Sequence, residues 1–142
     1  MVLDPASAVA PRDDGLVRVL SAQHTNAMLE LAEATNPGPF DRRTPELGVF
    51  VGVFQDARLV GMAGERFRLP GFVELSAIAV HPMARGKGLA TTMIRRLSSL
   101  ASARGETPFL HVFPNNPAVE LYESLGFRTR AELWILWRRP NR

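Results

Sequence analysis

Cysteine is absent from the 142 residues of this chain. That absence excludes zinc fingers, iron–sulfur clusters, thiol nucleophiles and disulfide scaffolds, and it fits a reducing compartment. Long apolar runs are absent too, since no stretch approaches the roughly 20 residues that cross a bilayer. The first residues are acidic rather than basic and no continuous apolar stretch follows them, so they do not predict a secretory signal. We therefore expect a cytoplasmic protein without a membrane partner.

Lysine is nearly absent, because Lys87 is the single lysine among 17 basic residues. The charge is also uneven along the chain. Residues 1–84 carry a net charge of −3, whereas residues 85–142 carry +6. The basic half faces an anionic ligand or only solvent. No basic run is interleaved with aromatic residues, so the pattern does not favour nucleic acid as a partner.

Length and composition are those of one globular domain. Of the residues, 46% are hydrophobic and 22% charged, and single domains cluster around about 100–150 residues. A chain of this size buries roughly two thirds of its unfolded surface, so we expect it to fold without a metal. Residues 1–15, rich in Ala, Pro, Ser and Asp, are expected to form a flexible N-terminal tail, and residues 16–142 a single domain.

The hydrophobic pattern predicts an α+β fold. Helices are expected after Ser21 up to Asn36, from Leu89 to Gly105, and from Asn116 to Leu125. Strands are expected at 16–20, 49–54, 59–68, 72–80, 109–113 and, broken or bulged, 127–139. This order predicts a mixed, mostly antiparallel central sheet flanked by helices.

The most informative stretch joins a strand to a helix through a loop with two glycines. Gly86 and Gly88 allow an anion to approach the backbone, while Arg85 and Lys87 add positive charge. The N-terminus of the following helix adds free N–H groups and the positive end of its dipole. The stretch therefore predicts a phosphate site, although an ordinary glycine-rich loop is the alternative. It matches neither the dinucleotide fingerprint nor the nucleoside-triphosphate loop.

Two motifs resemble those of the GNAT superfamily of N-acetyltransferases. Residues 80–90, VHPMARGKGLA, are similar to its acyl-coenzyme A signature Arg/Gln-x-x-Gly-x-Gly/Ala, with Arg85, Gly88 and Ala90 in the three positions. Residues 115–127, NNPAVELYESLGF, are similar to its second signature Asn-x-x-Ala-x-x-Leu-Tyr-x-x-x-Gly-Phe. The resemblance covers about residues 16–139 and implies a GNAT-like fold with acetyl-CoA as cosubstrate and no metal.

The resemblance also implies roles for individual residues. Tyr122 would give its proton to the leaving thiolate, with a core tyrosine as the alternative. The backbone of the strand end would pair with the pantetheine arm, with the oxyanion near the Val80 N–H. Asn115 would contact the cofactor while Asn116 caps the helix. The implied cofactor-binding residues are Ile78, Ala79, Val80, Arg85, Gly86, Lys87, Gly88, Leu89, Ala90, Thr91 and Asn115.

Glu74 is the candidate general base. Strand alternation would place it on one face with Ser76, Ile78 and Val80, four residues before the cofactor clamp. It could instead face solvent or pair with an arginine. His81 and His111 are the other titratable candidates, although structural or capping roles are favoured for both.

Two further groups are expected to be structural. Glu65 and Arg66 are expected to form a surface ion pair rather than to line the acceptor side. Trp134 and Trp137 are expected to pack as hydrophobic residues, with a role at an interface as the second option.

Together these features predict an N-acetyltransferase that moves an acetyl group from acetyl-CoA to a primary amine by direct attack in a ternary complex. The alternative is a GNAT-like module that binds acyl-CoA or associates with nucleic acid without catalysis. The acceptor is expected to be a small-molecule amine or a peptide N-terminus. The Pro-rich segment 36–48, where relatives often carry a second helix, leaves its class open. A homodimer is also open.

Overall fold

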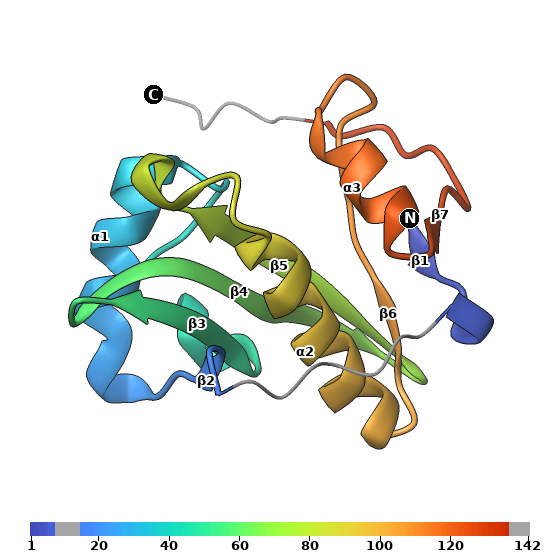
Figure 1. Cartoon of the computed structure of the whole chain (residues 1–142). Coiled ribbons are helices and arrows are strands. Elements are labelled where there is room, and N and C mark those ends of the chain that lie inside the picture. Colours follow the sequence, from blue (N-terminus) through green and yellow to red (C-terminus); the bar gives the residue numbers. More distant parts are fainter. Residues whose placement is uncertain (8–14, 137–142) are drawn as a thin grey trace, which may run out of the picture.

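The computed structural model describes residues 1–7 and 15–136, and it contains one seven-stranded mixed sheet (Figure 1). The strand order is β2-β3-β4-β5-β6-β1-β7. β5 and β6 are parallel, and the other neighbouring pairs are antiparallel. The predicted α+β class is therefore confirmed. The strands are β1 (Val2–Leu3), β2 (Arg18–Val19), β3 (Phe50–Gln55), β4 (Arg58–Leu69), β5 (Phe72–Val80), β6 (Thr107–Phe109) and β7 (Phe127–Arg128).

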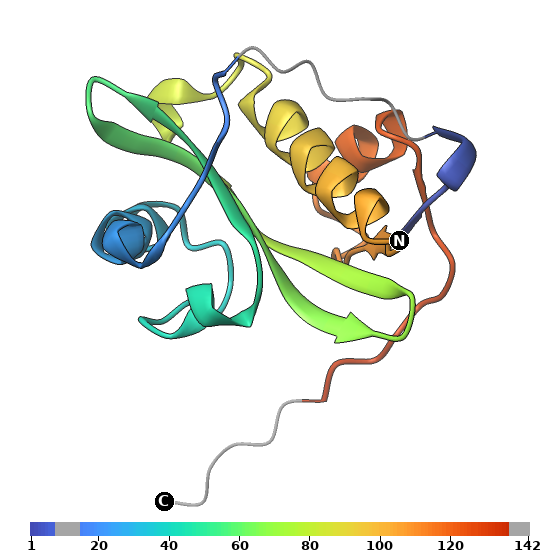
Figure 2. The ribbon, with the colours of Figure 1, turned by 90° about the horizontal axis from the view of Figure 1, so that it is seen from below.

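Helices cover both faces of the sheet, as Figure 2 shows from below. One face carries α1 (Thr25–Thr35), and the other carries α2 (Leu89–Ala103) and α3 (Ala118–Ser124). Short 3-10 turns complete the chain: η1 (Pro5–Ser7), η2 (Ala22–His24), η3 (Thr44–Leu47) and η4 (Pro82–Ala84). Within the described residues, no helix is long and apolar enough to span a membrane.

α2 forms where the hydrophobic spacing predicted a helix. Leu89, Met93, Leu97 and Ala101 are buried along one stripe, because residues three and four apart share a helix face. Their neighbours on the sheet belong to the same cluster, which includes Val51, Val60, Leu75 and Phe127. This packing fixes α2 on the sheet and so fixes the loop that precedes it.

A bulge in β5 reverses which face its side chains take. Met62 pairs with Ala79 but Gly64 pairs with Ser76, so β5 holds one extra residue there. Ala77 takes up the extra residue in a left-handed conformation, with φ at 51°.

The bulge overturns the predicted alternation. Leu75 packs in the cluster under α2 and α3, and after the bulge Ile78 and Val80 pack against that same cluster. Glu74 and Ser76 therefore face the side of α1, and Glu74 does not share a face with Ile78 and Val80.

The N-terminal residues are not a free tail, so the tail expected at 1–15 is wrong for residues 1–7. β1 lies between β6 and β7 and pairs with both, and Leu3 is buried in the main cluster. Two strand residues are too few to show a period in the sequence. The prediction of a tail therefore depended on the Ala, Pro, Ser and Asp content of residues 1–15 alone. Residues 8–14 lie outside the described part of the chain.

The last two predicted strands are also shorter or displaced. The strand expected at 109–113 is found at Thr107–Phe109. Of the strand expected at 127–139, only Phe127–Arg128 is a strand within the described residues, which end at residue 136. Trp134 is 96% exposed, so its expected packing is wrong, and Trp137 lies outside the described residues. High apolar content alone cannot decide strand pairing, because pairing also needs a neighbouring backbone.

Candidate functional site

The glycine loop before α2 has an open backbone. Gly86 and Gly88 have φ of 75° and 72°, a left-handed conformation that glycine adopts without strain. A Cβ at either position would meet nothing within 4 Å, so the space beside the loop is free. An anion can therefore approach this backbone closely.

The first turn of α2 supplies donors to the same space. Gly88 is the N-cap, with no side chain to accept from the helix, and the first backbone bond here runs from the Thr92 N–H to the Gly88 carbonyl. Among the described residues, the N–H groups of Leu89, Ala90 and Thr91 have no backbone acceptor. Together with the dipole of a 15-residue helix, they form a site that fits a pyrophosphate.

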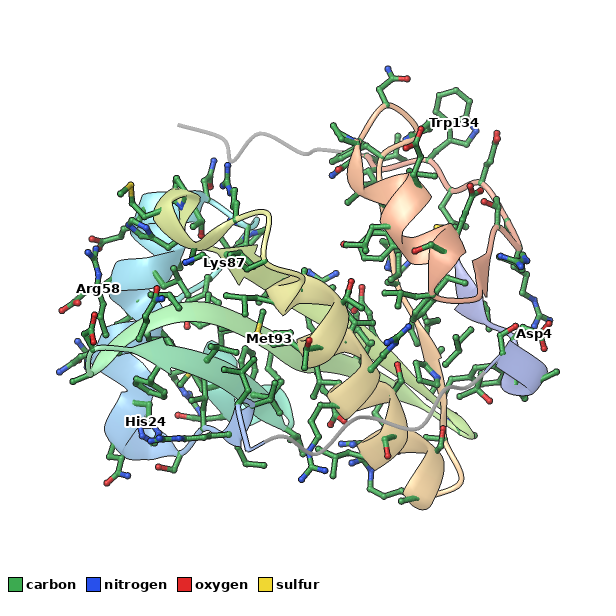
Figure 3. The ribbon with its side chains drawn as sticks, in the orientation of Figure 1. Asp4, His24, Arg58, Lys87, Met93 and Trp134 are labelled. Carbon is green, nitrogen blue, oxygen red and sulfur yellow. The ribbon has the colours of Figure 1, made fainter. Side chains whose placement is uncertain are left out.

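Two basic side chains flank this loop. Arg85 and Lys87 are exposed, and Figure 3 shows Lys87 beside the start of α2. The Arg85 Nε donates to the Val80 carbonyl at 3.1 Å, which ties the loop back to the end of β5. His81 caps the short turn between them, because its Nδ1 accepts from the Met83 N–H at 3.2 Å, as a capping role predicts.

The sheet divides next to the loop. β5 and β6 pair only through Phe72–Thr107, Val73–Pro108 and Glu74–Phe109. Beyond Glu74 the rest of β5, including Ile78, Ala79 and Val80, has no strand partner on the β6 side in the described chain. An extended ligand could add to this unpaired edge as a further strand does. Asn115 lies exposed on the segment that leaves β6 for α3.

Tyr122 lies on α3, in the cluster between that helix and the sheet. Its ring meets Phe127 edge to face, with 6.2 Å between centroids. Burial raises the pKa of the hydroxyl, so the group is a neutral proton donor at neutral pH. Among the described residues it has no hydrogen-bond partner, which leaves the proton available to a ligand.

Glu74 lies between Arg66 and His111 in a cluster that the sequence did not predict as a group. Its side chain is 1% exposed, and its two oxygens accept from Arg66 Nε at 2.9 Å and Arg66 Nη2 at 2.7 Å. The Oε1 atom also lies 2.7 Å from the Nδ1 of His111. Burial by itself would raise the pKa of Glu74, but the hydrogen bonds from Arg66 and His111 outweigh it and the pKa is lowered. The carboxylate is thus ionised and enclosed.

Arg66 therefore pairs with Glu74 and not with Glu65. The Glu65 carboxylate is buried and binds Arg68 and Arg104, while it accepts the Val49 N–H at 3.1 Å. The expected Glu65–Arg66 surface pair is wrong, because adjacent strand residues point to opposite faces. Strand alternation in the sequence could have predicted that Glu65 and Arg66 lie on opposite faces of the sheet. Within the described residues, no cluster of His, Asp and Glu is arranged to hold a metal ion.

Known proteins share this architecture. The family model described as FR47-like protein matches residues 50–135. A crystal structure from Novosphingobium aromaticivorans that is assigned to the GNAT family of acetyltransferases is 43% identical, with a TM-score of 0.86. That match covers 91% of this chain and 58% of the other.

Two curated relatives are shorter matches. N-alpha-acetyltransferase RimI of Mycobacterium tuberculosis is 37% identical over 83 residues, which are 56% of this chain and 51% of that protein. Cysteine-rich protein 2-binding protein of Mus musculus is 42% identical over 55 residues, 39% of this chain and 7% of that protein. The chain thus spans less than two thirds of the length of each of these proteins.

The divided sheet, the open glycine loop and the structural match define the fold as that of the GNAT acetyltransferases, which confirms the resemblance seen in the two motifs. Within that class the chain belongs to the FR47-like protein family.

Proposed function

We propose that this chain is an N-acetyltransferase that moves the acetyl group of acetyl-CoA to a primary amine by direct attack in a ternary complex. The observation that carries the proposal is the opening of the sheet beyond Glu74–Phe109, directly beside the glycine loop of α2. The open edge of β5 leads directly into the anion site at the glycine loop. This arrangement suits a ligand that has both an extended amide arm and a pyrophosphate. The cysteine-free composition supports a reducing, cytoplasmic location.

The donor would be held by residues already near one another. The N–H groups from Gly86 to Thr91 would bind the pyrophosphate, with Arg85 and Lys87 adding charge. The backbone of Ile78, Ala79 and Val80 would pair with the pantetheine arm, and Asn115 would close the opposite side. When bound, acetyl-CoA supplies the acetyl group as a thioester.

The remaining chemistry belongs to the side chains around the opening. The amine nitrogen attacks the thioester carbonyl, and the Val80 N–H is suited to stabilise the oxyanion that forms. When the C–S bond breaks, the electron pair stays on sulfur, and Tyr122 gives its proton to that thiolate. Its lack of a hydrogen-bond partner among the described residues supports a donor role, and its raised pKa keeps the hydroxyl protonated at neutral pH.

The acceptor is a small-molecule amine or a peptide N-terminus. The likeness to an N-alpha-acetyltransferase supports the second, although the match covers only 51% of that relative. The test is a panel of both kinds of amine with acetyl-CoA, read by release of free thiol and by the mass of the acceptor. Amine-dependent release with an acetylated product is expected. Binding of acetyl-CoA without transfer to any member would contradict catalysis and favour a binding module.

A further inference from the structure

We propose that His111 is the base that takes the proton of the acceptor ammonium, and that Glu74 is a positioning residue that orients the His111 ring. The inference rests on the proposed function and assigns the proton transfer within it. The sequence predicts Glu74 as the base and favours a structural or capping role for His111. The proposal assigns the base role to His111 instead.

Glu74 has no room to act on a substrate. Its side chain is 1% exposed, and Arg66 engages both of its oxygens in a two-pronged ion pair. His111 takes a further position on Oε1. A base must come within hydrogen-bond reach of the proton it removes. Glu74 reaches Arg66 and His111, and its surroundings hold it ionised rather than ready to accept a proton.

His111 has the access that Glu74 lacks. Its side chain is 46% exposed, and its ring packs edge to face against Phe109, with 5.8 Å between centroids. An ionised carboxylate can only accept, so the Nδ1 facing Glu74 must carry a hydrogen. In the neutral ring this leaves the lone pair on Nε2, on the edge turned away from Glu74. The contact therefore sets both the tautomer and the orientation, the arrangement that activates a histidine base.

The pair of Glu74 and His111 lies where the sheet opens. Glu74 is the last β5 residue paired with β6, and His111 follows its partner Phe109 by two residues, so the pair marks the point where the sheet opens. Leu110 packs in the cluster under α2 and α3, so His111 faces the side of α1, as Glu74 does. Tyr122 belongs to the opposite cluster. The base and the acid thus lie on opposite faces of the same opening.

The charged groups around His111 are few in the described chain. Glu74 faces it from β5, and Arg66 of β4 is held behind that carboxylate. On the β1 side, the Met1 ammonium is bonded to the Leu110 carbonyl at 2.7 Å. Among the described residues, the negative charge in contact with the ring is therefore that of Glu74.

The proton transfer balances as follows. The acceptor ammonium gives one proton to Nε2, and the free nitrogen lone pair forms the C–N bond at the thioester carbonyl. The C–S bond breaks and Tyr122 gives its proton to the thiolate. The nitrogen loses its second proton, which restores the Tyr122 hydroxyl. The net products are the amide, free thiol and one proton, which the His111 imidazolium returns to solvent.

The test compares His111→Asn, Glu74→Gln and the control His24→Asn by pH profiles of kcat/KM for the acceptor. Asparagine places an amide N–H near the position of Nδ1, so it keeps the bond to Glu74 and removes only the basic nitrogen. We expect His111→Asn to lose about 100-fold or more in kcat/KM at neutral pH. The deficit should shrink at alkaline pH, where free amine needs no base. His24 directly precedes α1 (Figure 3), and its substitution should leave the pH profile unchanged.

Glu74→Gln separates positioning from catalysis. As a positioning residue it should lower kcat with little change in KM for acetyl-CoA, and the acidic limb of the profile should persist. Loss of that limb in Glu74→Gln with near-parental rates in His111→Asn would overturn the proposal and return the base role to Glu74. Parental rates in both variants would overturn it as well. A parent without turnover on any amine would instead refute the proposed function, and the proposal with it.

Discussion

The ring and the hydroxyl of Tyr122 have different surroundings. The ring is buried, and burial raises the pKa of the hydroxyl, but the hydroxyl has no hydrogen-bond partner among the described residues and is not one of the fully buried polar atoms. The ring packs against Phe127 without help from the hydroxyl. Packing and chemistry can therefore be separated by a single atom.

We expect Tyr122→Phe to keep the fold and acetyl-CoA binding while kcat falls by about 10²–10⁴-fold, the usual range for loss of a general acid. Calorimetry measures the binding and a rapid-quench assay the chemical step. Equal kcat in the two proteins, with chemistry rate-limiting, would make Tyr122 a packing residue.

Glu74 contributes to stability as well as to the site. Its pKa is lowered in the fold from an ordinary value of 4.5, so folding favours the ionised form. This contribution is complete above the unfolded value of 4.5 and is lost as pH falls through the lower folded value. We expect the melting temperature of the parent to exceed that of Glu74→Gln at neutral pH and the gap to close in acid. A gap that widens in acid would contradict the ion pair.

The site residues divide by what a sequence can reveal. Gly86 and Gly88 were predictable, because their lack of a side chain is itself the signal. The cluster of Arg66, Glu74 and His111 was not, because its members come from β4, from β5 and from the segment that follows β6, which are far apart in the sequence. Nothing in the alternation of residues 72–80 announces that Ala77 adopts a left-handed conformation.

At the scale of elements, the β5 bulge decides which side chains meet at the opening. A non-glycine residue in the left-handed region costs about 1–2 kcal/mol. Ala77 and Ala79 are both buried against the α1 cluster, but only Ala77 has a positive φ. They form a matched pair for measuring that strain.

We expect Ala79→Gly to destabilise the protein by about 1 kcal/mol, because glycine in a strand loses more conformational entropy. Ala77→Gly should cost less or nothing, since relief of strain offsets that loss. Urea unfolding of both variants provides the comparison. A larger loss for Ala77→Gly than for Ala79→Gly would argue against the bulge.

Elements were predictable in proportion to their length. β3, β4, β5 and α2 carry enough periodic residues for the pattern to emerge, and the structure has them close to the expected bounds. β1 and β7 have two residues each, and they are strands because the backbones beside them provide partners. That information lies in tertiary structure and not in the local sequence.

In the whole molecule, the N-terminal strand β1 connects β6 to β7 within the sheet. β1 pairs with β6 on one side and β7 on the other, and Leu3 packs with Phe127 and Tyr122 in one cluster. The segment that carries His111 therefore depends on residues more than a hundred positions earlier.

We expect Leu3→Ala to lower the free energy of unfolding by about 2–4 kcal/mol, because Leu3 is 4% exposed and its loss leaves a cavity. Leu133→Ala is the control, since Leu133 is 66% exposed and should change stability by less than about 0.5 kcal/mol. Equal effects of the two substitutions on denaturant unfolding would show that β1 does not anchor the sheet.

Calorimetry of Gly88→Val measures whether the loop before α2 holds acetyl-CoA. Gly71, in the turn between β4 and β5, is the matched control, because both glycines have a positive φ and open space beside them. Valine should strain either turn similarly, but only at position 88 should it crowd the phosphates and shield N–H groups. We expect a loss of about 1–3 kcal/mol in acetyl-CoA affinity for folded Gly88→Val and none for Gly71→Val. Unchanged affinity in folded Gly88→Val would contradict it.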